Sequence, residues 1–296
     1  MGFCDRDKVG GTADSGRRIE ESGWSRLFEE SRYLSFSGLR VHFKVIRPDT
    51  PVKNRMLMLS SPLINTFHWR KMLPELAELG CLTVPVDLPG FGQSDTGAPQ
   101  ADQLRAELIW GVLDDVDRLL GAPMSMWHLA GHGSACATLL KMAAMYPDSV
   151  KSQIHISPTF SIAARPREAD ADRWFDANIL DARRFHQMIE RYSGYPMDDY
   201  IVDRMRRPLM RPGSRGAFAR MFKNAAAPPS QGMGFCPAMA IVGGRDPLID
   251  DARQAQIRRL LSDAETHRIG SAGHFPMETH SRAMRDYLRG WLRYND

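Results

Sequence analysis

Cysteine is scarce in this sequence, and its cysteines lie far apart. Cys4, Cys81, Cys136 and Cys236 are the four among 296 residues, and no two of them form a Cys-x-x-Cys pair. This spacing argues against a disulfide framework and against a structural zinc site. We therefore expect no bound metal, no cofactor and a reduced, cytoplasmic setting.

Long apolar runs and blocks of basic charge are missing too. No apolar run approaches the roughly 20 residues that a membrane-spanning helix needs, and the first residues lack the basic-then-apolar pattern of a secretion signal. The net charge of +4 is spread along the chain, unlike the basic block of a nucleic-acid-binding protein. We expect neither a membrane nor a nucleic acid as partner. The 43% hydrophobic composition is enough for one large core.

Short apolar runs alternate with helical patterns after a polar start. Residues 1–30 are rich in Gly, Ser and charge, which predicts a loose arm that ends in a short helix around Trp24–Glu29. The alternating segments Tyr33–Phe36 and Leu39–Ile46 meet at Ser37-Gly38 and predict a hairpin. Further apolar runs predict buried parallel strands: Arg55–Leu59, Cys81–Val86, Met124–Ala130, Val150–Ile156, Ala238–Val242 and Thr266–Ile269.

One stretch, Met124–Tyr146, combines a strand, a tight turn and an amphipathic helix. Gly131 and Ala135 leave room for the bend, because larger side chains there would collide with the strand or the start of the helix. The string Gly-His-Gly-Ser-Ala resembles the nucleophile elbow of the α/β-hydrolase family, Gly-x-nucleophile-x-Gly. Gly133 stands where that family places its reactive side chain, so the resemblance implies an elbow without a nucleophile.

Ser134 offers a different frame for the same turn. Moving the frame by one residue would make Ser134 the nucleophile, but it would place His132 where a small residue is needed. We favour the interpretation that Ser134 begins the helix and that its hydroxyl accepts a hydrogen bond from a free backbone N–H. We interpret His132, which is common at this place in the family, as a buried packing residue.

Three further motifs follow the order of the family. The string Asp87–Ser94, Asp-x-Pro-Gly-x-Gly-x-Ser, resembles a structural loop signature of α/β-hydrolases. Asp246 follows Gly243-Gly244 at the end of a predicted strand, where the family keeps its orienting carboxylate. His274 lies in a Gly-His-Phe string before Pro276, which matches the family's catalytic histidine loop. The resemblance therefore implies a base, His274, whose ring is held by Asp246.

The resemblance covers nearly the whole chain from about Tyr33. It implies a cap-bearing α/β-hydrolase fold, with a mostly parallel eight-stranded sheet flanked by helices and a helical cap inserted after the sixth strand. The strand and helix alternation stops at about Thr159, and the chain to Gly234 is helical in pattern but polar. We predict a flexible arm at 1–30, a core domain at 31–158 and 235–296, and a cap at 159–234.

The loop after the first predicted parallel strand departs from the family. Counting back from Trp69-Arg70, the family's His-Gly pair falls on Ser60-Ser61, and its usual oxyanion donor falls on Pro62. Proline has no N–H to donate, and a missing donor of this type costs about two to three powers of ten in rate. The Leu63 N–H and the Ser61 hydroxyl remain as substitutes.

A run of basic residues lies in the predicted cap, between Asp203 and Lys223. This segment has one acid. It is a candidate for steering an anionic substrate or an acidic carrier protein, although we favour the plainer interpretation of a solvated helix face. The basic residues are Arg204, Arg206, Arg207, Arg211, Arg215, Arg220 and Lys223.

An elbow without a nucleophile closes the usual covalent route, but a His–Asp pair still removes a proton or activates water. The family offers parallels in hydroxynitrile lyases and cofactor-independent dioxygenases, which use the histidine as a base on a substrate hydroxyl. Our first hypothesis is therefore a non-hydrolytic enzyme that depends on His274. It acts on a small polyketide-like or dicarbonyl substrate as a lyase, isomerase, cyclase or oxygenase.

Two other hypotheses remain open. One is hydrolysis of an ester or lactone by an activated water or by a displaced nucleophile, Ser134 or Ser61; it includes an ordinary hydrolase in which Gly133 is an engineered substitution. The other is a binding pseudoenzyme, as in the N-myc downstream-regulated family, which resembles hydrolases without their nucleophile. Retention of both Asp246 and His274 argues against the pseudoenzyme, because a pure binding module has no need for the pair.

Overall fold

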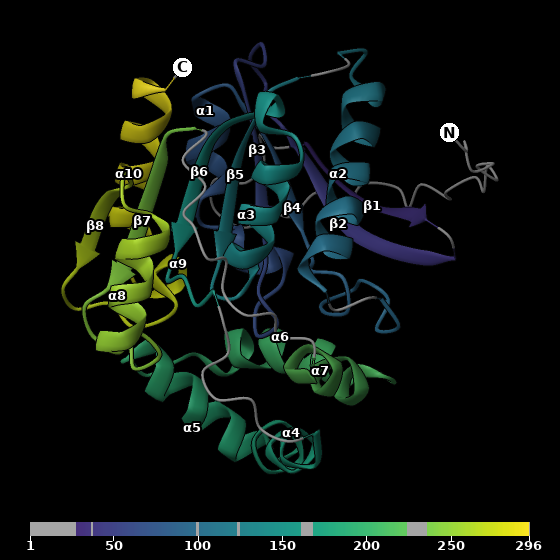
Figure 1. The fold of residues 1–296 in the computed structure, drawn as a ribbon, viewed down its shortest axis with the longest axis vertical. Coiled ribbons are helices and arrows are strands. Elements are labelled where there is room, and N and C mark those ends of the chain that lie inside the picture. The colour runs from purple at the N-terminus through teal and green to yellow at the C-terminus, as the bar shows by residue number, and fades with distance from the viewer. Residues whose placement is uncertain are drawn as a thin grey trace.

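A mostly parallel sheet forms the centre of the molecule (Figure 1). The computed structural model describes residues 28–36, 38–98, 101–122, 125–160, 168–223 and 236–295. Within these residues the sheet has eight strands in the order β1-β2-β4-β3-β5-β6-β7-β8. β1 and β2 form an antiparallel hairpin, β2 pairs antiparallel with β4, and the other neighbours are parallel. The strands are β1 (Phe28–Phe36), β2 (Leu39–Arg47), β3 (Asn54–Leu59), β4 (Cys81–Val86), β5 (Trp127–His132), β6 (Val150–Ile156), β7 (Ala238–Gly243) and β8 (Glu265–Ile269).

Two predictions about strand boundaries were wrong. Phe28 and Glu29 belong to β1 and not to a helix, because β1 continues its pairing with β2 as far as Phe28↔Arg47. The rest of the predicted arm, residues 1–27, lies outside the described residues, as does Ser37 of the hairpin turn. β5 begins at Trp127, and it runs on to His132 because His132 still pairs with Ile156 of β6.

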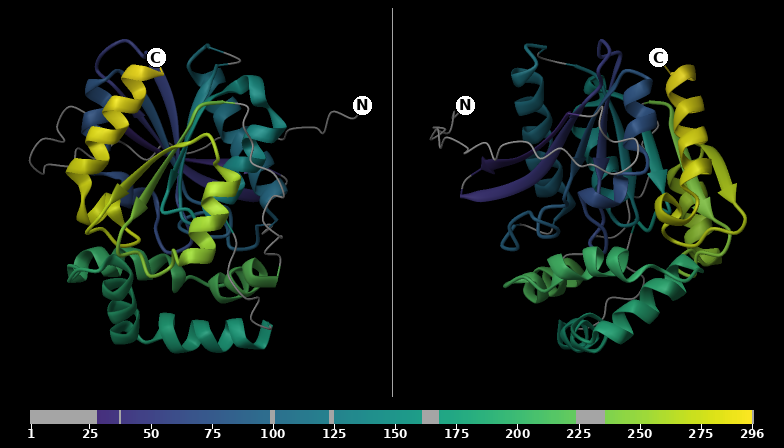
Figure 2. Two further views of the ribbon diagram at one scale, coloured as in Figure 1. Left: turned by 60° about the vertical axis from the view of Figure 1, so that its left-hand side comes forward. Right: turned by 180° about the vertical axis from the view of Figure 1, so that it is seen from behind.

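Helices cover both faces of the sheet (Figure 2). α1 (Leu73–Glu78) and α10 (Ser281–Tyr294) lie on one face, where the Trp291 ring N–H donates to Ser152 Oγ of β6 at 2.8 Å. α2 (Asp102–Leu119), α3 (Ala135–Met145) and α8 (Asp251–Leu260) lie on the other. Parallel strands covered on both faces must be apolar throughout. All six residues of β4 are accordingly buried.

A group of helices lies between β6 and β7 in the chain. It packs against the end of the sheet where the parallel strands finish, and it occupies the lower part of Figure 1. Its outer limits fall on residues 161–167 and 224–235, which lie outside the described residues. The helices are α4 (Glu168–Phe175), a π-helical turn η3 (Asp176–Leu180), α5 (Ala182–Ser193), α6 (Asp199–Leu209) and α7 (Ser214–Lys223).

Two arginines hold these helices in place: Arg211, between α6 and α7, and Arg220 on α7. The Arg211 guanidinium donates to the Gly92 and Ser94 carbonyls at 2.6 and 3.0 Å, and Arg220 donates to the Thr96 carbonyl. These carbonyls belong to the loop after β4, so the two arginines join α6 and α7 to the core. The solvated-face interpretation missed this role, because the acceptors lie more than 100 residues away in the sequence.

The Asp87 loop has the structural role that its motif indicates. Asp87 is fully buried and accepts from the backbone N–H groups of Thr66 at 2.7 Å and Gln93 at 2.9 Å. Its second oxygen also lies 2.8 Å from Nδ1 of His42. One carboxylate thus fixes the loops that follow β3 and β4. No helix within the described residues is long and apolar enough to cross a membrane.

Candidate active site

The elbow is a sharp turn between β5 and α3. Gly133 follows the last residue of β5 and has φ +58°, a left-handed conformation that costs a non-glycine residue about 1–2 kcal/mol. Its N–H donates to the Ile156 carbonyl at 2.9 Å. At Gly131, a Cβ would lie 2.7 Å from Cδ1 of Leu139 on α3. The strand and helix therefore approach closely because residue 131 has no side chain.

Gly133 faces two polar side chains that come from distant parts of the sequence. A Cβ built at this position would lie 3.4 Å from Nε2 of His274. It would also lie 3.3 Å from Cβ and 3.5 Å from Oγ of Ser61. Residue 133 therefore lies against both His274 and Ser61, and a side chain here would require one of them to shift by a few tenths of an ångström.

His274 and Asp246 form a buried pair. His274 Nδ1 lies 2.7 Å from Asp246 Oδ2, and the two residues are 4% and 7% exposed. The other carboxylate oxygen of Asp246 accepts from the Leu248 N–H at 2.9 Å. Because an ionised carboxylate only accepts hydrogen bonds, Nδ1 carries the proton of the neutral ring and Nε2 presents its lone pair. That lone pair is on the nitrogen nearest Gly133.

His132 and Ser61 are joined by a hydrogen bond whose direction follows from the structure. His132 Nε2 lies 2.7 Å from the His274 carbonyl oxygen, which only accepts, so Nε2 is the protonated nitrogen. Burial and the neighbouring His274 hold the pKa of His132 well below its usual value of 6.5, so the ring is neutral. His132 Nδ1 therefore accepts from the Ser61 hydroxyl at 2.8 Å.

This hydrogen bond commits the Ser61 proton to His132 and leaves the Ser61 lone pairs available. The packing interpretation of His132 was therefore incomplete. No local signal predicts the contact, because Ser61 and His132 lie 71 residues apart in the sequence. They meet because β3 and β5 are neighbours in the sheet.

Ser60 and Trp69 have a structural role in the loop after β3. Both are fully buried, and the Trp69 ring N–H donates to Ser60 Oγ at 3.0 Å. Pro62 and Leu63 form the turn that follows Ser61, closed by a bond from the Ile64 N–H to the Ser61 carbonyl at 3.1 Å. This bond fixes the backbone beside the Ser61 hydroxyl.

Ser134 directly precedes α3 as predicted, but the prediction that its hydroxyl caps the helix was wrong. Its φ of −69° and ψ of −19° are helical, and its side chain accepts no capping hydrogen bond; a capping residue usually has extended backbone angles. Across the part of the chain that the structure describes, no hydrogen bond uses the Ser134 N–H or the Leu63 N–H. Of the two predicted substitutes for the Pro62 donor, the Leu63 N–H is thus a candidate oxyanion donor, together with the Ser134 N–H. The prediction for the Ser61 hydroxyl was wrong, because that hydroxyl donates to His132.

A buried ion pair ties the loop after β3 to the loop that carries His274. Glu278 on α9 (Pro276–Thr279) accepts two hydrogen bonds from the Arg70 guanidinium, at 2.6 and 2.9 Å. Lys71 Nζ lies 3.2 Å from the same carboxylate. Burial alone would raise the pKa of Glu278, but the Arg70 hydrogen bonds and the positive neighbours outweigh it, so the pKa lies below 4.5.

We expect Glu278→Gln to lower the free energy of unfolding by about 3 kcal/mol at pH 7, because Arg70 loses its buried counter-charge. The carboxyl of Glu278 has a lower pKa in the folded protein than in the unfolded chain. It therefore stabilises the folded protein at pH values above its unfolded-state pKa, and this stabilisation is lost as the pH falls through the folded-state pKa. The difference between variant and wild type should therefore shrink from pH 7 to about pH 3 in urea unfolding.

Asp203→Asn is the control: it breaks an exposed pair with Arg207 and should lower the free energy of unfolding by about 0.5 kcal/mol. Equal losses, or a Glu278→Gln loss independent of pH, would contradict this account.

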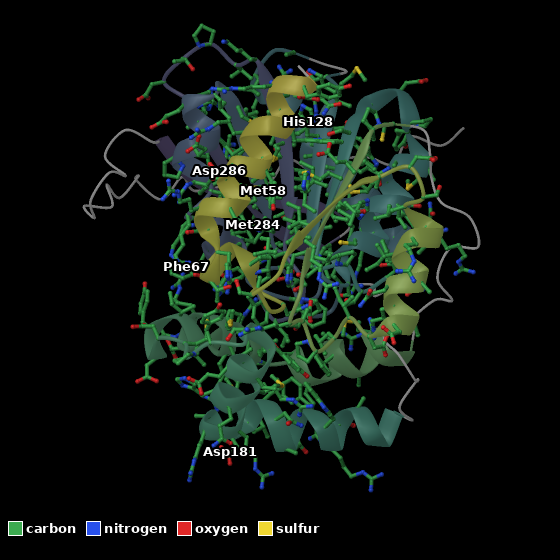
Figure 3. The ribbon with its side chains drawn as sticks, turned by 90° about the vertical axis from the view of Figure 1, so that its left-hand side faces the viewer. Met58, Phe67, His128, Asp181, Met284 and Asp286 are labelled. Atoms are coloured by element: carbon green, nitrogen blue, oxygen red, sulfur yellow. The ribbon has the colours of Figure 1, made fainter. Side chains whose placement is uncertain are left out.

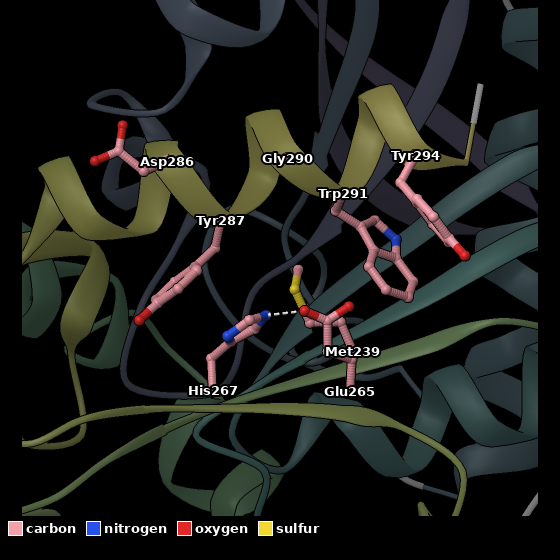
Figure 4. Close-up of a pocket in the computed structure, with 8 residues that line it drawn as sticks. All are labelled: Met239, Glu265, His267, Asp286, Tyr287, Gly290, Trp291 and Tyr294. Carbon is pink, nitrogen blue, oxygen red and sulfur yellow. Dashed lines mark ion pairs between the residues drawn. The ribbon is translucent and has the colours of Figure 1, made fainter.

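A hollow on the surface lies apart from the predicted site residues. A hollow of about 270 Å³ lies between β8 and α10 (Figure 4), and none of the predicted site residues lines it. Within it His267 pairs with Glu265 and stacks on the ring of Tyr287. No group of three or more His, Cys, Asp or Glu side chains within the described ranges is arranged to hold a metal ion.

Comparison with known proteins decides the family. The model of the Alpha/beta hydrolase family matches residues 64–287. This chain belongs to the alpha/beta hydrolase family. The matched part begins just after Pro62-Leu63 and includes Gly133, Asp246 and His274.

Individual relatives of this alpha/beta hydrolase are distant. Bifunctional epoxide hydrolase 2 of Mus musculus is 28% identical over 94 residues, which is 32% of this chain and only 16% of that protein. The structure of epoxide hydrolase CorEH without ligand has a TM-score of 0.70 at 15% identity and covers 91% of this chain and 100% of that one. Cfl2 from Burkholderia cenocepacia has a TM-score of 0.70 at 20% identity, covering 89% and 95%. At these identities the likeness shows the fold alone.

Proposed function

We propose that this protein is an enzyme in which His274, held by Asp246, acts as a general base on a small organic molecule placed over Gly133. No covalent enzyme intermediate forms. One observation carries the proposal: a Cβ at residue 133 would lie 3.4 Å from His274 Nε2. The base thus faces the space where a nucleophile would stand, and a group of the substrate enters that space instead.

Our first candidate reaction is non-hydrolytic. The substrate is a polyketide-like or dicarbonyl compound with an acidic proton, and the reaction is that of a lyase, isomerase, cyclase or cofactor-independent oxygenase. His274 Nε2 removes the proton, and Asp246 stabilises the imidazolium that results. The free N–H groups of Leu63 and Ser134 are candidates for holding the negative charge that develops on the substrate oxygen.

We propose that helices α4–α7 form a cap over this site, between core segments 31–158 and 235–296. In support, the His274 N–H donates to the Tyr192 carbonyl at the end of α5, at 2.7 Å. At Gly273 a Cβ would lie 2.3 Å from the same carbonyl, so residue 273 must lack a side chain for α5 to approach. The free thiols of Cys81, Cys136 and Cys236 support a reduced, cytoplasmic setting.

A second candidate reaction, hydrolysis of an ester or lactone, is favoured by the geometry of Ser61. Its proton is committed to His132, so Ser61 Oγ accepts a hydrogen bond on the side that borders Gly133. A water placed there donates one proton to His274 Nε2 and the other to Ser61 Oγ, which leaves a lone pair for attack. Ser61 is a poor nucleophile itself, because the lowered pKa of His132 makes that ring a weak base.

Ser61→Ala distinguishes these two reactions. If water is the reacting group, the variant loses an acceptor that orients it, and we expect kcat for ester cleavage to fall by about 10-fold to 100-fold. If the substrate itself donates the proton, loss of the Ser61 acceptor should change kcat by less than about threefold. A complete loss of activity with a trapped Ser61 adduct in the wild type would contradict both.

The experiment that tests the proposed function is a turnover screen with mass detection. The wild type is incubated with activated esters, lactones and acidic dicarbonyl compounds, with and without oxygen. Non-hydrolytic products that disappear in His274→Ala support the first reaction, and ester cleavage that disappears in the same variant supports the second. Turnover that is unchanged in His274→Ala would mean that another group is the base, and no turnover of any compound would leave the binding pseudoenzyme as the better explanation.

A further inference from the structure

Arg204 on α6 differs from the arginines that follow it in the chain. Arg211 and Arg220 donate to core carbonyls, and Arg207 pairs with Asp203. In the part of the chain that the structure describes, no hydrogen bond or ion pair uses the Arg204 guanidinium, and its Nε is buried. Buried donors on a cation are normally paired. The Arg204 guanidinium therefore keeps N–H groups that a ligand could use.

The Arg204 guanidinium lies against an aromatic ring. Its central carbon is 4.7 Å from the centre of the Phe67 ring, in the 3₁₀ turn η1 (Thr66–Trp69). Tyr200 of α6 also contacts Phe67, with the ring centres 5.7 Å apart. Figure 3 shows Phe67 at the boundary between the core and the helices α4–α7. Contact with an aromatic ring orients the planar guanidinium and leaves N–H groups at its edge for a planar anion.

Positive charge exceeds negative charge around Phe67. Arg70 also lies over the ring, with its central carbon 4.0 Å from the ring centre, and Lys71 is next to it in the chain. Both pair with a single carboxylate, that of Glu278. Three cations therefore face two carboxylates here, that of Glu278 and that of Asp87, which accepts from the Thr66 N–H beside Phe67. Arg204 is the cation that neither carboxylate pairs. The local charge favours an anionic ligand.

Arg204 is also attached to the loop of the proposed active site. Its backbone carbonyl accepts a hydrogen bond from Nδ2 of Asn65 at 2.7 Å. Asn65 lies four residues after Ser61, which borders the space over Gly133. The loop therefore connects the reacting position with Arg204 through a few residues of fixed backbone.

We propose that Arg204 binds a carboxylate of the substrate, so that the molecules on which the His274 base acts are small organic acid anions. This inference rests on the proposed function, whose substrate class it narrows. The guanidinium offers two parallel N–H groups to the two carboxylate oxygens. The rest of the substrate extends past the Ser61 loop toward Gly133.

The test compares carboxylates with their neutral amides as ligands, so it needs no turnover. Butyrate and phenylacetate, together with butyramide and phenylacetamide, are titrated against the wild type and variants by calorimetry or ligand-observed NMR. We expect the wild type to prefer each carboxylate by about 10-fold to 100-fold. Arg204→Gln should abolish this preference, and Arg204→Lys should retain part of it, which a misfolded variant does not. Arg207→Gln, one turn away with an exposed guanidinium, is the matched control and should keep the full preference.

Three results would overturn the inference: equal binding of acid and amide, no binding of either carboxylate by the wild type, or the same loss in Arg207→Gln as in Arg204→Gln. The last would indicate general electrostatic attraction instead of a site. His274→Ala separates this inference from the proposed function. If no turnover is found but His274→Ala still prefers carboxylates, the Arg204 site is supported and the proposed reaction is not. If turnover is found but the wild type shows no preference for carboxylates, the proposed reaction is supported and the Arg204 site is not.

Discussion

Replacement of Gly133 by serine is expected to create an ester hydrolase that works through a covalent acyl intermediate. The new hydroxyl would stand beside His274 Nε2, which lies 3.4 Å from the Cβ position. In an evolved triad the nucleophile contributes roughly 10⁶ to the rate, whereas a missing oxyanion donor removes about 10²–10³. Allowing for imperfect alignment as well, we expect activated esters to be cleaved about 10²-fold faster than by the wild type.

The backbone conformation of residue 133 determines which control variant this experiment needs. A side chain at φ +58° costs about 1–2 kcal/mol, so Gly133→Ser should also be less stable than the wild type. Gly133→Ala carries the same strain without the hydroxyl and is the matched control. A burst of product equal to the enzyme concentration, seen with Gly133→Ser alone, would show the acyl intermediate. If the alanine variant gains as much activity as the serine variant, residue 133 is not at the reacting position.

Loss of the His274 imidazole should have the largest effect on the natural reaction. A positioned general base contributes about 10²–10⁴ to a rate, so His274→Ala should lower kcat by that factor. It should also lower the free energy of unfolding, because the buried Asp246 carboxylate loses its hydrogen-bond partner. Asp246→Asn should lower kcat by a similar factor of about 10²–10⁴, because an amide at this position no longer fixes the tautomer with Nε2 unprotonated.

His186→Ala is the matched control for these two variants. His186 lies on α5 at the surface, where it pairs with Glu190 and Asp199, and its loss should leave kcat within about twofold. Steady-state rates measured on the substrate found in the turnover screen check these values. A His274→Ala rate within tenfold of the wild type would mean that another group is the base.

The sequence predicted the sheet well because buried parallel strands have a clear signature. β4 is apolar in nearly every position and is buried in all six, so burial and composition agree residue by residue. The elbow and the His274 loop were identified because their small residues are required by local geometry. Gly131 and Gly133 show this directly, since a Cβ at either position would meet atoms of neighbouring elements.

The contacts that the sequence did not predict join residues far apart in the chain. The Ser61–His132 hydrogen bond depends on the order of strands in the sheet, and the Glu278–Arg70 pair spans 208 residues. The role of Arg211 depends on where α6 is placed against the core. Local patterns of charge and hydrophobicity contain none of this information, so the arginines of α6 and α7 could not be separated into structural ties and a candidate binding residue until the fold was known.

The central claim is that His274 acts over Gly133 without a covalent enzyme intermediate. Intact-protein mass spectrometry during turnover of an activated ester tests it most directly, with Gly133→Ser as the positive control. We predict an acyl adduct on Gly133→Ser and an unmodified mass for the wild type throughout the reaction. An adduct on the wild type, located by peptide mapping to Ser61 or Ser134, would contradict the claim and identify a displaced nucleophile.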